Sequence, residues 1–231
     1  MVPVVRELAA AGVPVSIDTT RATTASAALE AGAVMVNDVS GGRADPRMAR
    51  VVAEAGVPWV LTHRRGPSEH MYGAATYQDV VHEVCTELLA RADAAVAAGV
   101  AAERLVLDPG FGFAKHPVHD LGLLAGLGDV VDLGFPVLVG MSRKGILGHA
   151  LADPGGQPRP VGGRASASTS ACVLAALAGA WGVRVHDVLD SSDAVRVVAA
   201  LPHRVGGDVL GQRSAAARPV EGVLPTTVDG W

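Results

Sequence analysis

Lysines and aromatic residues are scarce in this chain of 231 residues. Aromatic side chains make up 3% of it, and only two of its 19 lysines and arginines are lysines, Lys115 and Lys144. A lysine that persists where arginine otherwise supplies the positive charge indicates a need for a compact ammonium group on a flexible stem. The alternative is that both lysines are surface charges without a special role.

Other absences exclude whole classes of protein. The net charge is −4 and there is no basic run, which argues against nucleic-acid binding. No apolar stretch approaches the roughly 20 residues of a membrane span, and the first residues lack the pattern of a signal peptide. Cys85 and Cys172 fit neither a metal-binding pattern nor a disulfide framework. We therefore expect a cytoplasmic protein that binds neither nucleic acid nor membrane.

One unit recurs along the chain: a short apolar run, a polar turn and a helical stretch. The runs are nearly continuous in apolar residues, which is typical of parallel strands buried on both faces. Strands alternating with helices predict an α/β fold with right-handed crossovers. The six predicted strands cover residues 13–18, 34–37, 57–63, 104–108, 136–141 and 182–186.

Several residues mark the expected ends of helices. Asp45 and Pro46 resemble an N-cap followed by proline in the first helical position, and Gly56 fits the position after the last turn. Thr76 can cap a long amphipathic helix that ends at Gly99, with an apolar side formed by Val80, Val81, Val84, Leu88, Leu89 and Val96. The small apolar residues of 165–180 predict a buried helix.

Each predicted strand ends in, or is followed by, a polar residue. A single such residue is weak support for a site, since turns favour Asp, Asn and Ser. Ligands of α/β folds bind at the carboxyl ends of the strands, however, and six polar residues at these ends predict a binding site there. They are Asp18, Asn37, His63, Asp108, Ser142 and His186.

The segment Asp108-Pro-Gly-Phe-Gly-Phe-Ala-Lys115 is the most specific one in the chain. Its glycines allow a tight turn close to a ligand, and aromatic faces beside a carboxylate suit a flat heteroaromatic ligand with N–H donors. The alternative, a turn with phenylalanine packed below it, fits Phe111 better than it fits both phenylalanines. The segment lacks the Gly-Lys-Ser/Thr of a phosphate-binding loop.

Two later segments place cations at strand ends. Met141-Ser-Arg-Lys-Gly145 puts a hydroxyl and two cations at a strand-to-helix turn, where they can hold a carboxylate, a phosphate or a ring carbonyl. In Val183-Arg-Val-His-Asp187, Arg184 and His186 would face the same side of a strand and could converge on an anion. The alternatives are a solvated helix start and a structural histidine.

Together these segments resemble bacterial dihydropteroate synthases, especially the actinobacterial form. The resemblance covers roughly residues 2–200 and rests on Ser16-Ile-Asp-Thr19, Val36-Asn-Asp-Val39, the 108–115 segment, Val139-Gly-Met-Ser-Arg-Lys144 and Arg184-Val-His-Asp187. It implies a (β/α)8 barrel that joins a 6-hydroxymethyl-7,8-dihydropterin diphosphate to 4-aminobenzoate in folate synthesis, with release of pyrophosphate.

The resemblance also implies a role for each matching residue. Asp18, Asn37 and Asp108 would bind the pterin, and Gly140 and Lys144 would line its site. Ser142 and Phe113 would help to place 4-aminobenzoate. Arg184 and His186 would bind the diphosphate, so that Lys144, Arg184 and His186 carry the catalysis. The family implies Mg²⁺ as cofactor and a homodimer, with no metal ligand within this chain.

The chain departs from the family in its first part. Six predicted strands stand where the family has eight, and the first two strands, with their mobile loops and magnesium-linked Asn, have no counterpart before residue 13. We therefore expect residues 1–201 to form an incomplete barrel with weak pterin binding and little turnover, and residues 202–231 to be a disordered tail. The alternatives are a non-catalytic pterin-binding relative and a pterin-dependent methyltransferase module.

Overall fold

The computed structural model describes residues 1–66, 73 and 75–202. These residues form two compact units. The first contains residues 1–63 and 87–107, and the second contains the described residues of 64–86 and 108–202. The predicted tail lies, from residue 203 onward, outside the described residues, and the assignment of residues 1–201 to one domain stays a prediction.

The first unit is built on a four-stranded sheet. Its strands follow one another in the order β1 (Ser16–Asp18), β2 (Met35–Asp38), β3 (Trp59–Thr62) and β4 (Leu105–Asp108). The β1–β2 and β2–β3 pairs are parallel. Every residue of β2, β3 and β4 is buried, as continuous apolar runs predict for strands covered on both faces.

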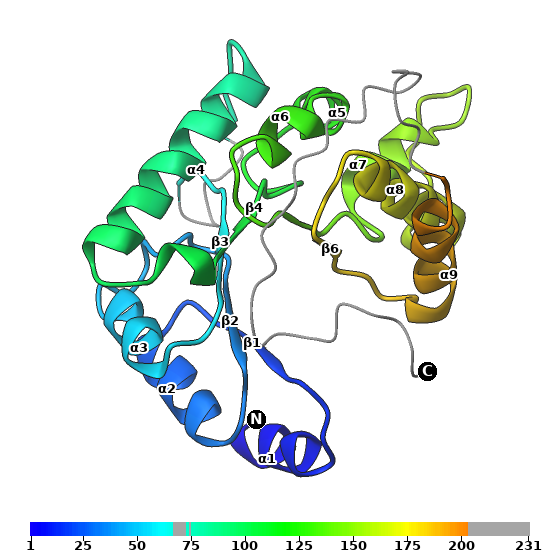
Figure 1. Cartoon of the computed structure of the whole chain (residues 1–231). Coiled ribbons are helices and arrows are strands. Elements are labelled where there is room, and N and C mark those ends of the chain that lie inside the picture. The colour runs from blue at the N-terminus through cyan, green and yellow to red at the C-terminus, as the bar shows by residue number, and fades with distance from the viewer. Residues whose placement is uncertain (67–72, 74, 203–231) are drawn as a thin grey trace. The chain divides into compact units, whose positions relative to one another are not determined.

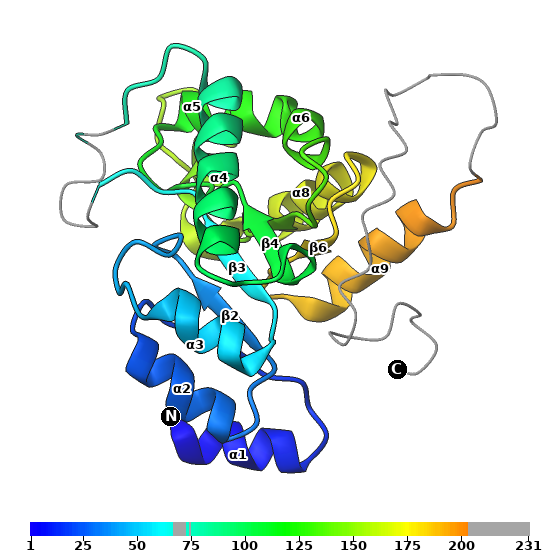
Figure 2. The same ribbon diagram turned by 60° about the vertical axis from the view of Figure 1, so that its left-hand side comes forward.

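Helices connect these strands. The first unit contains α1 (Val2–Ala10), α2 (Ala22–Glu30) and α3 (Met48–Ala55), followed later by the 3₁₀ turn η2 (Ala102–Arg104). Helices α2 and α3 lie side by side (Figures 1 and 2). Helix α4 (Val80–Ala97) belongs to the second unit up to Thr86 and to the first unit from Glu87 on.

The second unit pairs two short strands with helices. Strands β5 (Leu138–Val139) and β6 (Gly182–Val183) are parallel, which is the pairing of a βαβ unit. Helices α8 (Ala165–Leu177) and α9 (Val188–Ala199) pack against each other (Figure 1). The remaining elements are α5 (Pro117–Ala125), α6 (Leu127–Val131), α7 (Gly145–Ala150) and the 3₁₀ turn η3 (Val161–Gly163).

All six predicted strands are present, but each is shorter than expected or shifted at its ends. The largest differences are at β5, predicted over 136–141, and at β6, predicted over 182–186. An apolar run continues past the last ladder hydrogen bond wherever the chain stays buried, so composition overstates strand length. Arg184 and His186 consequently follow β6 and do not lie on one face of it.

Two predicted helix starts are wrong. Helix α3 begins at Met48, two residues after Pro46, although the Asp45 carboxylate still accepts a hydrogen bond from the Arg47 N–H at 3.1 Å. Helix α4 is capped by Asp79 and not by Thr76, since Asp79 accepts bonds from the Val81 and His82 amides at 3.1 and 3.0 Å. The predicted ends hold: Gly56 has φ +64° and Gly99 has φ +96°.

Two predicted apolar faces also need correction. On α4, Val84 and Leu88 are buried as expected, but Leu89 and Val96 are exposed. Helix α8 was expected to be buried throughout, yet its buried residues form one stripe, Ser168, Ala171, Cys172 and Ala175, and Leu174 is 49% exposed. No described helix is long and apolar enough to cross a membrane.

Neighbouring leucines on α4 test this assignment of its buried face. Leu88→Ala removes a fully buried side chain and should lower the free energy of unfolding by about 2–5 kcal/mol. Leu89→Ala, at a position 36% exposed, serves as the matched control and should cost less than about 1 kcal/mol. Urea denaturation of the whole chain followed by circular dichroism measures both. Equal losses would contradict the assignment.

Candidate functional site

Asp18 and Asn37 are adjacent in the first unit. They are register partners at the ends of β1 and β2, and the Asn37 Nδ2 group donates a 2.7 Å hydrogen bond to Asp18 Oδ2. The Asn37 side chain is 4% exposed, and its Oδ1 has no hydrogen-bond partner among the described residues. A buried carbonyl without a partner is costly unless something else donates to it. The sequence-predicted pair is therefore brought together, with one acceptor left open.

His63 has a structural environment in the same unit. It is fully buried, and its Nε2 lies 3.1 Å from Glu87 Oε2. Arg91, also buried, donates from Nη1 to the Thr62 carbonyl at 2.8 Å and lies 3.7 Å from Glu87. The end of β3 is thus fixed by contacts to α4, which favours the structural alternative for this polar strand end.

The second unit contains the turn that follows β4. Asp108 is 1% exposed and accepts the Gly110 N–H at Oδ1 over 2.8 Å. Its Oδ2 has no hydrogen-bond partner among the described residues, and the nearest cation is the Arg184 Nη2, at 3.8 Å. Phe111 is fully buried, whereas Phe113 is half-buried. The alternative of a phenylalanine packed below the turn therefore fits Phe111 and not Phe113.

Lys144 lies against this turn. Its Nζ donates to the Phe111 carbonyl at 2.6 Å and lies 4.7 Å from the centre of the Phe113 ring. Burial lowers the pKa of Lys144 from its ordinary value, and the Arg184 guanidinium adds to that lowering, while the carboxylates of Asp108 and Asp120 act against it. Lys144 is therefore a cation held by the protein and not a solvated surface charge.

Lys115 is the more deeply buried lysine, at 2% exposure. Its Nζ donates to the carbonyls of Gly110 and Phe113 at 3.1 and 3.2 Å. The next residue back, Ala114, has φ +51°, and the Tyr77 hydroxyl donates to its carbonyl at 3.1 Å. Lys115 therefore shapes the loop from inside and is not the surface charge of the alternative interpretation.

The turn after β5 contains Ser142, which contacts His186, and Arg143, whose contacts hold the turn in place. The Ser142 Oγ lies 2.9 Å from His186 Nδ1 and accepts the His186 N–H at 3.3 Å. Arg143 adopts φ +60°, a conformation that costs an L-residue roughly 1 kcal/mol or more. Its Nη2 donates to Asp187 Oδ1 at 2.7 Å and its N–H to Ser168 Oγ at 3.0 Å, which holds the turn in this shape.

Gly140 leaves room for a cation. A Cβ at this position would lie 2.9 Å from the Arg184 Nη2. The Arg184 backbone N–H donates to the Val139 carbonyl at 2.9 Å, so the two strands β5 and β6 bring Gly140 and Arg184 side by side. The second unit by itself thus gathers Asp108, Phe113, Gly140, Ser142, Lys144, Arg184 and His186 around the ends of its strands.

Sequence reasoning missed Asp120, in the first turn of α5. The side chain is 2% exposed and accepts the Gly112 N–H at 2.9 and 3.1 Å from its two carboxylate oxygens. Burial raises the pKa of Asp120 to about 6, against the Gly112 hydrogen bond and the attraction of Lys115 and Lys144. Acidic residues are common in the first turn of a helix, so the residue type alone did not mark Asp120 as part of a site. The one signal in the sequence was that Asp120 follows Lys115 by five residues.

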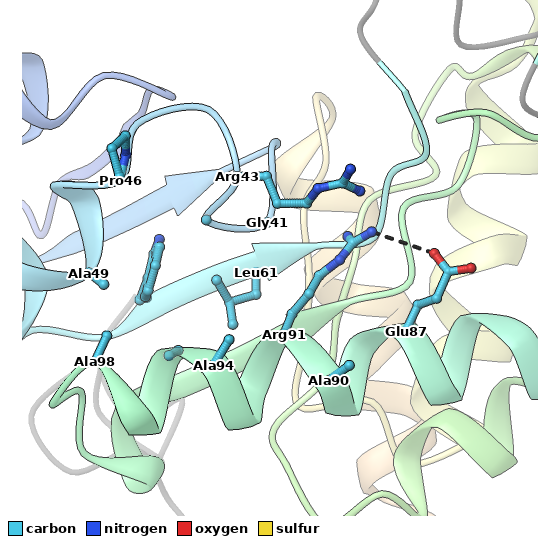
Figure 3. Close-up of a pocket in the computed structure, with 13 residues that line it drawn as sticks. Gly41, Arg43, Pro46, Ala49, Leu61, Glu87, Ala90, Arg91, Ala94 and Ala98 are labelled. Atoms are coloured by element: carbon cyan, nitrogen blue, oxygen red, sulfur yellow. Dashed lines mark ion pairs between the residues drawn. The ribbon is translucent and has the colours of Figure 1, made fainter.

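A groove of the first unit lies elsewhere. Figure 3 shows it between the α3 region and α4, with the Arg91–Glu87 ion pair at its edge. Its volume is about 420 Å³, and its walls include Pro46, Ala49, Ala90, Ala94 and Ala98. Trp59 also lines it, and the buried Trp59 Nε1 has no hydrogen-bond partner among the described residues. None of the predicted site residues lines it.

A metal site of the chain's own is not found in the described residues. Across residues 1–66, 73 and 75–202, no three His, Cys, Asp or Glu side chains gather closely enough to hold an ion. Asp38, the carboxylate next to Asn37, is fully buried and accepts the Ser40 and Gly42 amides at 2.8 and 3.1 Å. The described carboxylates therefore do not fit a protein-bound Mg²⁺.

Comparison with known proteins agrees with this arrangement. Residues 1–186 match the family described as pterin binding enzyme. Dihydropteroate synthase of Mycobacterium leprae is 58% identical over 204 residues, which cover 88% of this chain and 72% of the relative. The chain therefore spans about seven-tenths of that relative's length.

Solved structures give the same result. The Xanthomonas albilineans dihydropteroate synthase with 4-aminobenzoic acid superposes with a TM-score of 0.78 at 40% identity, covering 87% of this chain and 71% of that one. The Thermus thermophilus enzyme in complex with 6HMPPP gives 0.79 at 41% identity, covering 87% and 77%.

The match over residues 1–186 and the likeness to these solved structures show that the chain is a pterin-binding enzyme of the (β/α)8-barrel class, and its parallel strands joined by helices agree with that fold. Within that class, the chain belongs to the dihydropteroate synthases, the transferases of folate synthesis.

The buried carboxyl of Asp120 makes a prediction about pH. Its pKa is raised in the folded state, so its ionisation between about pH 4 and pH 6 should weaken the fold as pH rises. Asp120→Asn removes that titration, and the stability of the variant relative to the wild type should grow from pH 4 to pH 7. Urea denaturation at each pH measures the difference in the free energy of unfolding between the variant and the wild type. This difference would stay constant with pH if the pKa of Asp120 were not raised in the folded state. Exposed Asp129→Asn is the control.

Proposed function

We propose that this chain binds a 6-hydroxymethyl-7,8-dihydropterin diphosphate and 4-aminobenzoate and couples them. The bond between the pterin methylene carbon and the diphosphate oxygen breaks, the arylamine nitrogen bonds to that carbon, and pyrophosphate and a proton leave. The relatives support this proposal, since one was solved with 4-aminobenzoic acid and another with 6HMPPP. In this chain the main support is the pair of buried, open acceptors Asn37 Oδ1 and Asp108 Oδ2.

These acceptors suit the pterin ring, whose edge is rich in N–H donors. Asp18, Asn37 and Asp108 are proposed to accept from it, each from within its own unit. Asn37 is oriented for this role, because its amide nitrogen is already bonded to Asp18 and its carbonyl oxygen is left to accept. A ligand that donates to either oxygen, Asn37 Oδ1 or Asp108 Oδ2, removes the cost of a buried unsatisfied atom.

Lys144 is proposed to donate to the acceptor atoms of the pterin and to flank 4-aminobenzoate. The half-buried ammonium already contacts the Phe113 ring, which would stack on a flat substrate. Ser142, in the preceding turn, would help to place the carboxylate end of 4-aminobenzoate. Gly140 would keep this part of the site open, as its close approach to Arg184 supports.

Arg184 and His186 are proposed to bind the diphosphate. Both lie after β6, and Arg184 stands 3.8 Å from the Asp108 carboxylate, which keeps the guanidinium within the site. Positive charge beside the departing pyrophosphate stabilises the negative charge that develops on it and so lowers the barrier to breaking the carbon–oxygen bond, and no side-chain nucleophile is needed. Lys144, Arg184 and His186 are thus the proposed catalytic residues.

We propose that Mg²⁺ would be bound by the diphosphate of the substrate, because the described residues do not fit a protein site for it. Mg²⁺ commonly binds through substrate phosphates while keeping several waters. We also propose a cytoplasmic location, supported by the resemblance and by Cys85 and Cys172, which are both free thiols.

A homodimer through the late helices is the proposed assembly. Helix α9 exposes Val188, Leu189 and Val197 at 69%, 74% and 67%, and α8 exposes Leu174 at 49%. Exposed apolar side chains on two packed helices favour an interface over these helices.

Leu189→Glu tests the proposed dimer, because it places a charge on the exposed surface of α9. Light scattering should show a dimer for the wild type and a monomer for the variant. Val118→Glu, at a similarly exposed position on α5, is the control and should remain dimeric. A monomeric wild type would contradict the proposed assembly.

Lys144→Ala tests the proposed site directly. It should weaken binding of the pterin diphosphate and of 4-aminobenzoate at least about tenfold, since a charged hydrogen bond is lost. Arg159→Ala, an exposed cation of the same unit, should bind like the wild type. Calorimetric titration measures both, and unchanged affinity in Lys144→Ala would refute the assignment. The low turnover expected from the sequence is measured separately by pyrophosphate release with both substrates and Mg²⁺.

A further inference from the structure

One peptide group of the 108–115 turn is held at both ends by charged side chains. The carbonyl of Phe111 and the N–H of Gly112 belong to the same planar peptide unit. The carbonyl accepts from Lys144 Nζ at 2.6 Å, and the N–H donates to Asp120 at 2.9 and 3.1 Å. Lys144 and Asp120 thus form hydrogen bonds to opposite ends of the planar 111–112 peptide group.

The charges match the dipole of that peptide. A carboxylate faces its N–H end and an ammonium faces its carbonyl end, so each interaction strengthens the other through the polarised group. Asp120 and Lys115 are almost completely buried and Lys144 is half-buried, which keeps water from screening the arrangement. The charged groups that act on Asp120 are Lys115 and Lys144, and those that act on Lys144 are Asp108, Arg184 and Asp120.

Lys115 fixes the rest of the turn and leaves this peptide to Asp120. Its Nζ donates to the carbonyls of Gly110 and Phe113, which belong to the 110–111 and 113–114 peptide groups. Gly112 has φ +76°, and a Cβ there would lie 3.5 Å from the Lys144 Cδ. The turn can therefore present the Phe111 carbonyl to Lys144 only while the 111–112 plane keeps its orientation.

We propose that Asp120 is a positioning residue for Lys144, acting through the Phe111–Gly112 peptide to hold the ammonium at the substrate site. This inference rests on the proposed role of Lys144 in substrate binding. Asp120 itself is 2% exposed and contacts no substrate in this role. It sets where the ammonium lies and how readily it keeps its proton.

The scarcity of lysine gives a direct measurement. Because the whole chain contains two lysines, labelling lysine with ¹³C at Cε yields two side-chain resonances, and Lys115→Arg assigns them. In the ligand-free protein, Asp120→Asn should lower the pKa of Lys144 below its wild-type value, because the carboxylate that favours the charged form is gone. Asp129→Asn, an exposed carboxyl of α6, should leave the titration unchanged.

Binding supplies the second measurement. Asp120→Ala, which also loses the acceptor for Gly112, should weaken binding of the pterin diphosphate about tenfold. Asp120→Asn, which keeps an oxygen for the Gly112 N–H, should recover most of that loss near pH 7. Far-UV circular dichroism establishes that each variant is folded. Asp120→Asn is nearly isosteric and keeps the measurement available if Asp120→Ala does not fold.

The outcomes separate this inference from the function on which it rests. If Lys144→Ala loses binding while Asp120→Asn and Asp120→Ala leave both the Lys144 titration and the affinity at wild-type values, the positioning role is wrong and the proposed function stands. If Lys144→Ala binds normally, the proposed function fails. A shifted Lys144 pKa in Asp120→Asn with weakened binding in Asp120→Ala supports both.

Discussion

The main constraint in the second unit is that the ammonium group of Lys144 must stay charged although it is partly shielded from bulk water. Lys144 is half-buried, and burial works against its charge. The protein compensates with a main-chain carbonyl at 2.6 Å, an aromatic face and two nearby carboxyls. The turn between Asp108 and Lys115 supplies that carbonyl, so its positive-φ residues, its buried lysine and its contact to Asp120 all serve one requirement.

A second feature of the protein is that each unit leaves a buried acceptor open. Asn37 donates to Asp18 and keeps Oδ1 without a partner among the described residues, while Asp108 at the end of β4 keeps Oδ2 open in the same way. Open buried acceptors lower stability, so each one in a native fold needs an explanation. We propose that stability is given up at these strand ends in exchange for recognition of a donor-rich ring.

The strands could be predicted from the sequence because they have a local signal, and the candidate site residues were proposed from specific segments. Continuous apolar runs mark buried parallel strands, and the segments around Asp108 and Lys144 are specific. Strand ends, helix caps and exposed faces were less predictable, because Asp79 in place of Thr76, or Leu89 outside the core, depends on packing between distant segments. Asp120 was out of reach for the same reason: only the folded turn brings its carboxyl to the Gly112 amide.

The central claim is that buried acceptors at the strand ends recognise a pterin. Calorimetric titration of the full chain with 6-hydroxymethyl-7,8-dihydropterin diphosphate, in the wild type and in Asp108→Asn, tests it most directly. The substitution replaces a carboxylate by an amide whose nitrogen can only donate, so we expect binding by the wild type and at least about tenfold weaker binding by the variant. Equal affinities, or a wild type that does not bind the pterin, would contradict the claim.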